Sequence, residues 1–98
     1  MKIVWSPLAL ARAGEISAYT ATDNPPAAAR WIEAIFTKVE QLQLAPQSGR
    51  VVPEVGNPEI RELIYGNYRI IYRVERRWVA ILTIRHGKQQ LPTADIVA

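Results

Sequence analysis

The chain has 98 residues, a formal net charge of +3 and no cysteine. This length is enough for one small domain, residues 1–98, and too short for two. The lack of cysteine excludes disulfides and thiolate metal sites and is typical of proteins in a reducing cytoplasm. No apolar run approaches the ~20 residues that cross a bilayer, and Pro7 breaks the N-terminal segment too early for a secretory signal. We therefore expect a cytoplasmic protein that does not contact a membrane.

The chain begins with a short extended segment, Lys2 to Trp5, followed by a helix start signal. Ser6 has the side chain of an N-cap residue, and Pro7 suits the first helical position, where its missing amide hydrogen is not needed. Apolar residues at helical spacing then predict a helix to about Ala21. Gly14 lies among small residues, which favours a role in close packing against another element.

Asn24 and Pro25 repeat the cap-and-proline signal and predict a second helix to about Leu44. Its apolar residues form one continuous stripe: Ala28, Ile32, Ile35, Val39 and Leu42. Because the linker between the two helices is short, they should lie antiparallel. Residues 45–58 contain three of the seven prolines and two of the five glycines, which predicts an ordered loop.

The second half predicts an antiparallel β-meander. Two alternating strands flank Gly66 and Asn67 within Ile60 to Val74, and a third strand runs from Trp78 to His86. With a two-residue turn, Leu63 pairs with Ile70 and Arg61 with Tyr72. The predicted fold class is therefore α+β: a short N-terminal strand and an antiparallel helix hairpin packed on one face of the meander.

Strict alternation divides the side chains of the meander between two faces. The face that receives the helices would carry Leu63, Tyr65, Tyr68, Ile70, Tyr72, Val74, Val79 and Ile81. The opposite face would carry Glu62, Arg69, Arg73 and His86 together with Ile64, Ile71, Leu82 and Ile84. Arginine mixed with exposed isoleucine is typical of a protein-binding groove, so we expect the arginines to be dispensable for the core. The alternative is that the C-terminal segment folds over this face, although it is short for that purpose.

Basic residues are concentrated in this half of the chain. Between Arg61 and Lys88 there are seven arginines and lysines against two glutamates. Such asymmetry indicates an anionic partner, either nucleic acid or an acidic protein segment. A single histidine allows no multi-histidine metal site, and we expect neither a metal nor a cofactor. Alone, His86 is more often a polar residue at a strand end than a catalyst.

Several motifs together resemble toxins of the RelE/ParE superfamily of type II toxin–antitoxin systems. They are the connector PQSGR (residues 46–50), REL at residues 61–63, YRIIYRV at residues 68–74, and IL with a following HG within residues 81–87. The resemblance covers nearly the whole chain. It implies the α+β fold described above and a cognate antitoxin, a small acidic protein with a DNA-binding N-terminal domain. Toxin and antitoxin would form a hetero-oligomer that reaches operator DNA only through the antitoxin.

The two branches of this superfamily differ in mechanism. RelE-like members cleave mRNA in the ribosome, and here Arg69 and His86 stand near positions that such enzymes use. The remaining pattern departs from that branch, because Ile60 and Glu62 replace lysines and Gly87 follows His86. A glutamate facing RNA would repel phosphate. The sequence of residues 61–74 resembles the ParE branch more closely. This resemblance implies a non-enzymatic poison of DNA gyrase. An mRNA endoribonuclease and a degenerate, non-toxic member remain the alternatives.

Candidate site residues follow from the face assignment and the resemblance. The expected toxicity face consists of Glu62, Arg69, Arg73 and His86, of which Arg69 and His86 would be catalytic in a nuclease. The expected antitoxin-binding residues are Trp31, Phe36, Ile64, Ile71, Leu82 and Ile84. For Trp31 and Phe36, packing within the helix hairpin is the simpler interpretation.

Overall fold

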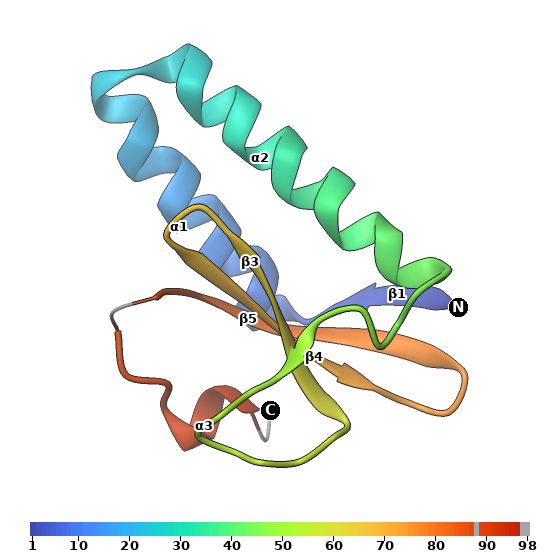
Figure 1. Cartoon of the computed structure of the whole chain (residues 1–98). Helices are drawn as coiled ribbons and strands as arrows, with labels where there is room; N and C mark the ends of the chain where they lie inside the picture. The colour runs from blue at the N-terminus through green and yellow to red at the C-terminus, as the bar shows by residue number, and fades with distance from the viewer. Residues whose placement is uncertain (88, 97–98) are drawn as a thin grey trace.

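A computed structural model describes residues 1–87 and 89–96 and has an α+β architecture. A five-stranded sheet has the order β1-β5-β4-β3-β2. Helices α1 and α2 cover one face of this sheet, and the short helix α3 lies on the other face (Figure 1). The elements are β1 (Lys2–Trp5), α1 (Pro7–Asp23), α2 (Pro25–Glu40), the 3₁₀ helix η1 (Gln41–Gln43), β2 (Arg50–Val51), β3 (Ile60–Tyr65), β4 (Tyr68–Val74), β5 (Trp78–His86) and α3 (Thr93–Ile96).

Both predicted helix starts are confirmed. The side chains of Ser6 and Asn24 accept hydrogen bonds from the amides of Ala9 and Ala27, at 3.0 and 3.1 Å. Each cap satisfies a backbone donor that has no partner within its helix. Asn24 alone separates α1 from α2, so the helices fold back on each other as an antiparallel hairpin (Figure 1). The expected packing role of Gly14 is wrong, because among residues 1–87 and 89–96 no heavy atom beyond the adjoining part of its own helix lies within 4 Å of a Cβ placed there.

The β3–β4 hairpin has the predicted register, with Leu63 opposite Ile70 and Arg61 opposite Tyr72. Gly66 takes a φ of 57° in the two-residue turn, a conformation that glycine adopts without strain. Two edge pairings were not part of the prediction. β1 runs parallel to β5, and β2 pairs antiparallel with β3, so the connector of residues 45–58 contributes a short strand.

Two apolar cores form, one on each face of the sheet. The larger lies under the helix hairpin, where Ile35, Val39 and Leu42 pack on the predicted helix-facing residues of the strands. The smaller lies on the opposite face and consists of Val52, Ile60, Ile71, Leu82, Leu91 and Ile96. The C-terminal segment therefore covers Ile71 and Leu82. The expectation that these two residues line an open groove is wrong.

An extra residue in β5 overturns part of the face assignment. Ile71 pairs with Thr83 while the next residue, Tyr72, pairs with Ile81, so Leu82 is the additional residue of a β-bulge. Side chains alternate strictly along a strand. One extra residue therefore moves every later side chain of the strand to the face opposite to the predicted one. Ile84 is accordingly buried in the core beneath the helices, on the face opposite to the predicted one.

Candidate functional site

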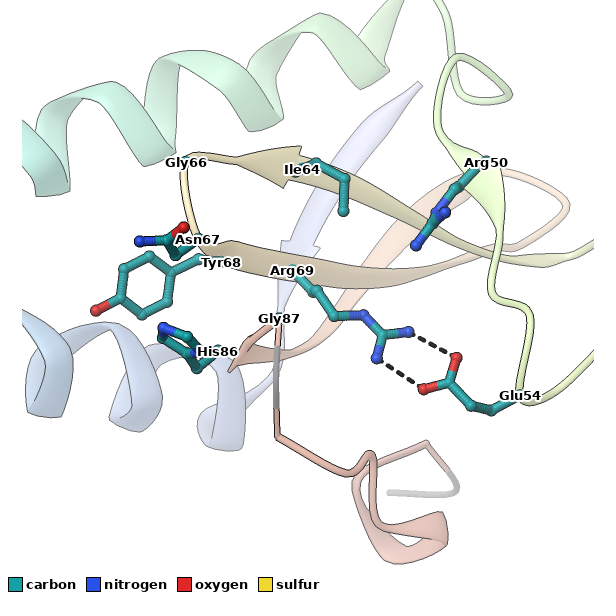
Figure 2. A pocket seen from close by; sticks show the side chains of 9 residues that line it. All are labelled: Arg50, Glu54, Ile64, Gly66, Asn67, Tyr68, Arg69, His86 and Gly87. Carbon is teal, nitrogen blue, oxygen red and sulfur yellow. Dashed lines mark hydrogen bonds and ion pairs between the residues drawn. The ribbon is translucent and has the colours of Figure 1, made fainter.

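Four charged side chains form an ion network beside the β3–β4 hairpin. The Arg69 Nε donates to Glu62 at 2.6 Å. Its two terminal nitrogens donate to both oxygens of Glu54 at 2.7 and 2.8 Å (Figure 2). Arg50 donates to the second oxygen of Glu62. Two guanidinium groups and two carboxylates thus balance each other, and we call these four residues the Arg69 network.

The Arg69 network includes buried charges that the fold must compensate. The side chains of Arg69 and Glu62 are only 8% and 0% exposed, whereas that of Glu54 is 46% exposed. The hydrogen bond from Arg69 holds the pKa of Glu54 below its ordinary value of 4.5. Its bonds to Glu54 and Glu62, opposed by burial, raise the pKa of the Arg69 guanidinium. Arg69 is therefore needed to compensate a buried carboxylate, contrary to the expectation that it is dispensable for the core.

A pocket of about 260 Å³ lies against this network. Arg50, Glu54 and Arg69 line one side, and Tyr68 and His86 line the other (Figure 2). The Arg69 guanidinium points to Glu54 and away from His86 (Figure 2).

His86 of β5 lies opposite Tyr68 of β4, and their rings meet edge-on with centroids 5.6 Å apart. Trp31 of α2 continues the aromatic row, 5.3 Å from Tyr68. The β-bulge places His86 on the same side of the sheet as Tyr68. The prediction that it shares a face with Glu62, Arg69 and Arg73 is wrong. Arg85, to which alternation assigned no role, takes the position opposite Arg69 instead.

Arg73 lies on the same face as Arg69 but at the other end of β4. Its side chain is 35% exposed, approaches Glu75 at 3.9 Å and donates to the carbonyl of Ile96 at 3.4 Å. The four residues of the predicted toxicity face thus lie in three places. Glu62 and Arg69 belong to the Arg69 network, His86 belongs to the aromatic row, and Arg73 lies beside the C-terminal segment.

The predicted antitoxin-binding residues also differ in accessibility. Ile64 and Phe36 are exposed, at 46% and 38%, and Phe36 packs on Trp5 with ring centroids 4.6 Å apart. Trp31 is half-buried against Tyr68. The other three predicted residues, Ile71, Leu82 and Ile84, are buried within this chain.

Two members of the Arg69 network were missed at the level of sequence. Arg50 belongs to the PQSGR connector, but its spacing does not reveal that β2 places it opposite Glu62. Glu54 lies in an irregular segment with no periodic signal. Within residues 1–87 and 89–96, no group of three or more His, Cys, Asp or Glu side chains is placed to hold a metal ion. No helix of those residues is long and apolar enough to span a bilayer.

Comparison with known proteins gives consistent results. A family model described as the ParE toxin of type II toxin–antitoxin system, parDE, matches residues 3–91. A protein of Sinorhizobium fredii (strain NBRC 101917 / NGR234), named "Putative toxin Y4kP", is 43% identical over 94 residues, which is 93% of each chain. A solved structure described as the chromosomal ParDE TA system from P. aeruginosa aligns with a TM-score of 0.77 at 23% identity, covering 90% of this chain and 97% of the other. That last similarity concerns the fold.

Proposed function

Since the chain belongs to the ParE toxin family of type II toxin–antitoxin systems, we propose that it inhibits growth by poisoning DNA gyrase. In this proposal it binds the enzyme in its cleaved-DNA state, and a cognate antitoxin neutralises it. The antitoxin is a small acidic protein with a DNA-binding N-terminal domain, and the hetero-oligomer contacts operator DNA only through that domain.

The observation that carries the gyrase proposal is the pairing of Arg69. Cleavage of RNA through its 2′-hydroxyl requires a base, an acid and cations that stabilise the charged phosphorane. In this chain the Nε and both terminal nitrogens of Arg69 already donate to Glu62 and Glu54. A phosphate that approached this guanidinium would meet two carboxylates. The arrangement favours binding of a protein target over phosphate chemistry.

The antitoxin part of the proposal is supported by charge and by exposed apolar side chains. The chain is basic, with a net charge of +3, and attracts an acidic partner. Phe36 and Ile64 remain exposed and are the accessible candidates for antitoxin contact among those predicted.

An mRNA endoribonuclease is the second candidate, because one pocket gathers Arg50, Tyr68, Arg69 and His86. A histidine titrates near neutral pH, and a tyrosine hydroxyl can donate or accept a proton. The Arg50 side chain is 60% exposed and donates to Glu62 through Nε, so in this candidate its guanidinium meets the phosphate. Arg69 would contribute only if its ion pairs opened on the ribosome.

Expression of the chain alone distinguishes the two. For a gyrase poison we expect DNA breaks and DNA-damage signalling before any loss of mRNA, and protection in cells that carry a poison-resistant gyrase. In vitro, the purified chain should increase the amount of cleaved DNA held by gyrase. Early mRNA cuts at defined codon positions, with intact DNA, would instead establish the nuclease.

A further inference from the structure

A second pocket, of about 300 Å³, lies on the far side of Tyr68 and His86 from the Arg69 network. β1 pairs with β5 only as far as Ile81, so the last residues of β5 have an open edge. Helix α1 passes beside this edge. Arg12, Ile16 and Tyr19 of α1 line the pocket with Tyr68, Ile84 and Arg85. We call it the α1–β5 pocket.

The two arginines of the α1–β5 pocket are poorly paired. Arg12 approaches Glu15 at 3.7 Å and Asp95 at 3.8 Å, both beyond hydrogen-bond distance. Arg85 donates a hydrogen bond to the carbonyl of Gln90 at 3.2 Å. In residues 1–87 and 89–96, the Nε atoms of Arg12 and Arg85 are buried without a hydrogen-bond partner. Arg69, by contrast, uses all three of its nitrogens.

The ion pairs around these arginines are looser than those of the Arg69 network. One oxygen of the buried Asp95 accepts from the Thr83 hydroxyl at 3.1 Å and lies 3.8 Å from both Arg12 and Arg85. Two guanidinium groups therefore converge on a single buried carboxylate. Glu15, at the rim of the pocket, is 67% exposed, and solvent weakens its pairing with Arg12 at 3.7 Å without removing its charge. The α1–β5 pocket is therefore lined by two loosely paired guanidinium groups, which would attract a carboxylate that enters it.

We propose that the α1–β5 pocket binds an acidic side chain of the antitoxin, with an adjacent apolar residue packed on Ile16 and Tyr19. This inference rests on the proposed function, because it needs an antitoxin. A peptide fits better than a nucleic acid for two reasons. Glu15 at the rim and Asp95 beneath would repel the successive phosphates of a backbone, whereas a single carboxylate can be placed between the arginines. The pocket is also at the lower end of ligand-site volumes, which suits one or two side chains.

Calorimetric titration of the purified chain with the antitoxin encoded beside its gene tests the proposal. We expect Arg12→Gln to weaken the affinity by about 10- to 100-fold, as loss of a desolvated charge-assisted contact does. Glu15→Gln removes a competing carboxylate from the rim and should tighten binding about two- to fivefold. Arg77→Gln is the matched control, because it removes the same charge from the exposed β4–β5 turn. Its affinity should stay within about twofold of the wild type.

The outcomes separate this inference from the proposed function. An antitoxin that binds the wild type tightly and Arg12→Gln equally well overturns the pocket assignment and leaves the toxin function intact. Equal losses for Arg12→Gln and Arg77→Gln also overturn it, since general attraction would then explain both. No binding to the wild type would refute antitoxin neutralisation itself. Binding of an oligonucleotide that Arg12→Gln abolishes would show that the pocket recognises phosphate instead. If a thermal melt shows that Arg12→Gln does not fold, the affinity of Glu15→Gln tests the pocket assignment instead, because a change at this exposed position should not disturb the fold. Tighter binding would support the assignment, and unchanged or weaker binding would overturn it.

Discussion

Arg69 of β4 and Glu62 of β3 form a hydrogen-bonded ion pair at 2.6 Å, and both side chains are almost completely buried. They are diagonal neighbours, because Arg69 lies opposite Ile64 while Glu62 lies opposite Ile71. Arg50 and Glu54 join the pair from β2 and the following loop. The pair thus fastens the connector of residues 45–58 to the sheet.

Arg69→Ala should destabilise the fold by about 3 kcal/mol, because it leaves the Glu62 carboxylate buried with Arg50 as its remaining partner. Denaturant unfolding followed by circular dichroism measures the loss. Arg77→Ala, at an exposed position, is the control and should change the free energy of unfolding by less than about 0.5 kcal/mol. Replacing both charges, as Glu62→Leu with Arg69→Met, should recover most of the loss. A single Arg69→Ala variant with wild-type stability would show that the pair contributes nothing to the fold.

Glu54 should contribute to acid sensitivity. Its pKa is lowered in the folded chain, chiefly by the hydrogen bond from Arg69, so the stability it supplies is present above its ordinary pKa of 4.5. That stability disappears as the pH falls through the lower, folded value, because protonation breaks the ion pair. Thermal melts between neutral pH and the acid range should show a shallower decline for Glu54→Gln than for the wild type. Parallel curves would contradict this assignment. Glu33→Gln, at an exposed position of α2, serves as the control.

Two glycine-to-alanine changes should have opposite signs. Gly14→Ala, on the exposed side of α1, should stabilise the chain by roughly 0.5–1 kcal/mol through helix propensity and reduced freedom of the unfolded chain. Gly49→Ala would place its Cβ 2.5 Å from the Glu62 carbonyl oxygen and 2.6 Å from the Tyr72 hydroxyl. Backbone must then shift, which should destabilise the chain by about 2 kcal/mol or more. Midpoints of urea unfolding decide both signs.

His86→Ala should leave growth inhibition largely intact if the chain poisons gyrase. The change then removes one contact among several, and a peripheral contact contributes under about 1 kcal/mol. Loss of a general acid–base group in a nuclease would instead lower the rate roughly 100- to 10,000-fold. Growth after induction, combined with assays for DNA breaks and mRNA cuts, measures the effect. Tyr68→Phe keeps the ring that packs on Trp31 and His86 and tests the hydroxyl alone. Toxicity that disappears in either variant together with mRNA cuts would identify the nuclease.

Bound antitoxin should raise the melting temperature of the chain. A ligand that binds only the folded state stabilises it by about 4 kcal/mol at a thousand times its dissociation constant. For a domain of this size, such a gain should shift the midpoint by well over 10 °C. Scanning calorimetry with and without the antitoxin measures the shift. An unchanged midpoint at saturating antitoxin would argue strongly against neutralisation by direct binding.

The sequence alone determined the features that depend on local chemistry. The caps at Ser6 and Asn24, the apolar stripe of α2 and the Gly66 turn each act within a few residues, so they can be recognised along the chain. The same holds for the face of β3 and β4 that meets the helices, because side chains alternate strictly from the turn onward.

Features that depend on contacts between distant segments could be read only from the three-dimensional structure. The bulge at Leu82 moved the side chains of Ile84 and His86 to the other face of the sheet. The alternation of residues along β5 does not indicate this extra residue. Whether Arg69 faces solvent or a carboxylate depended on where Glu54 lies, and Glu54 follows β2, which is positioned by pairing with β3. Burial of Ile71 and Leu82 depended on Leu91 and Ile96 reaching back across the sheet. Such contacts join residues far apart in sequence, and local periodicity carries no information about them.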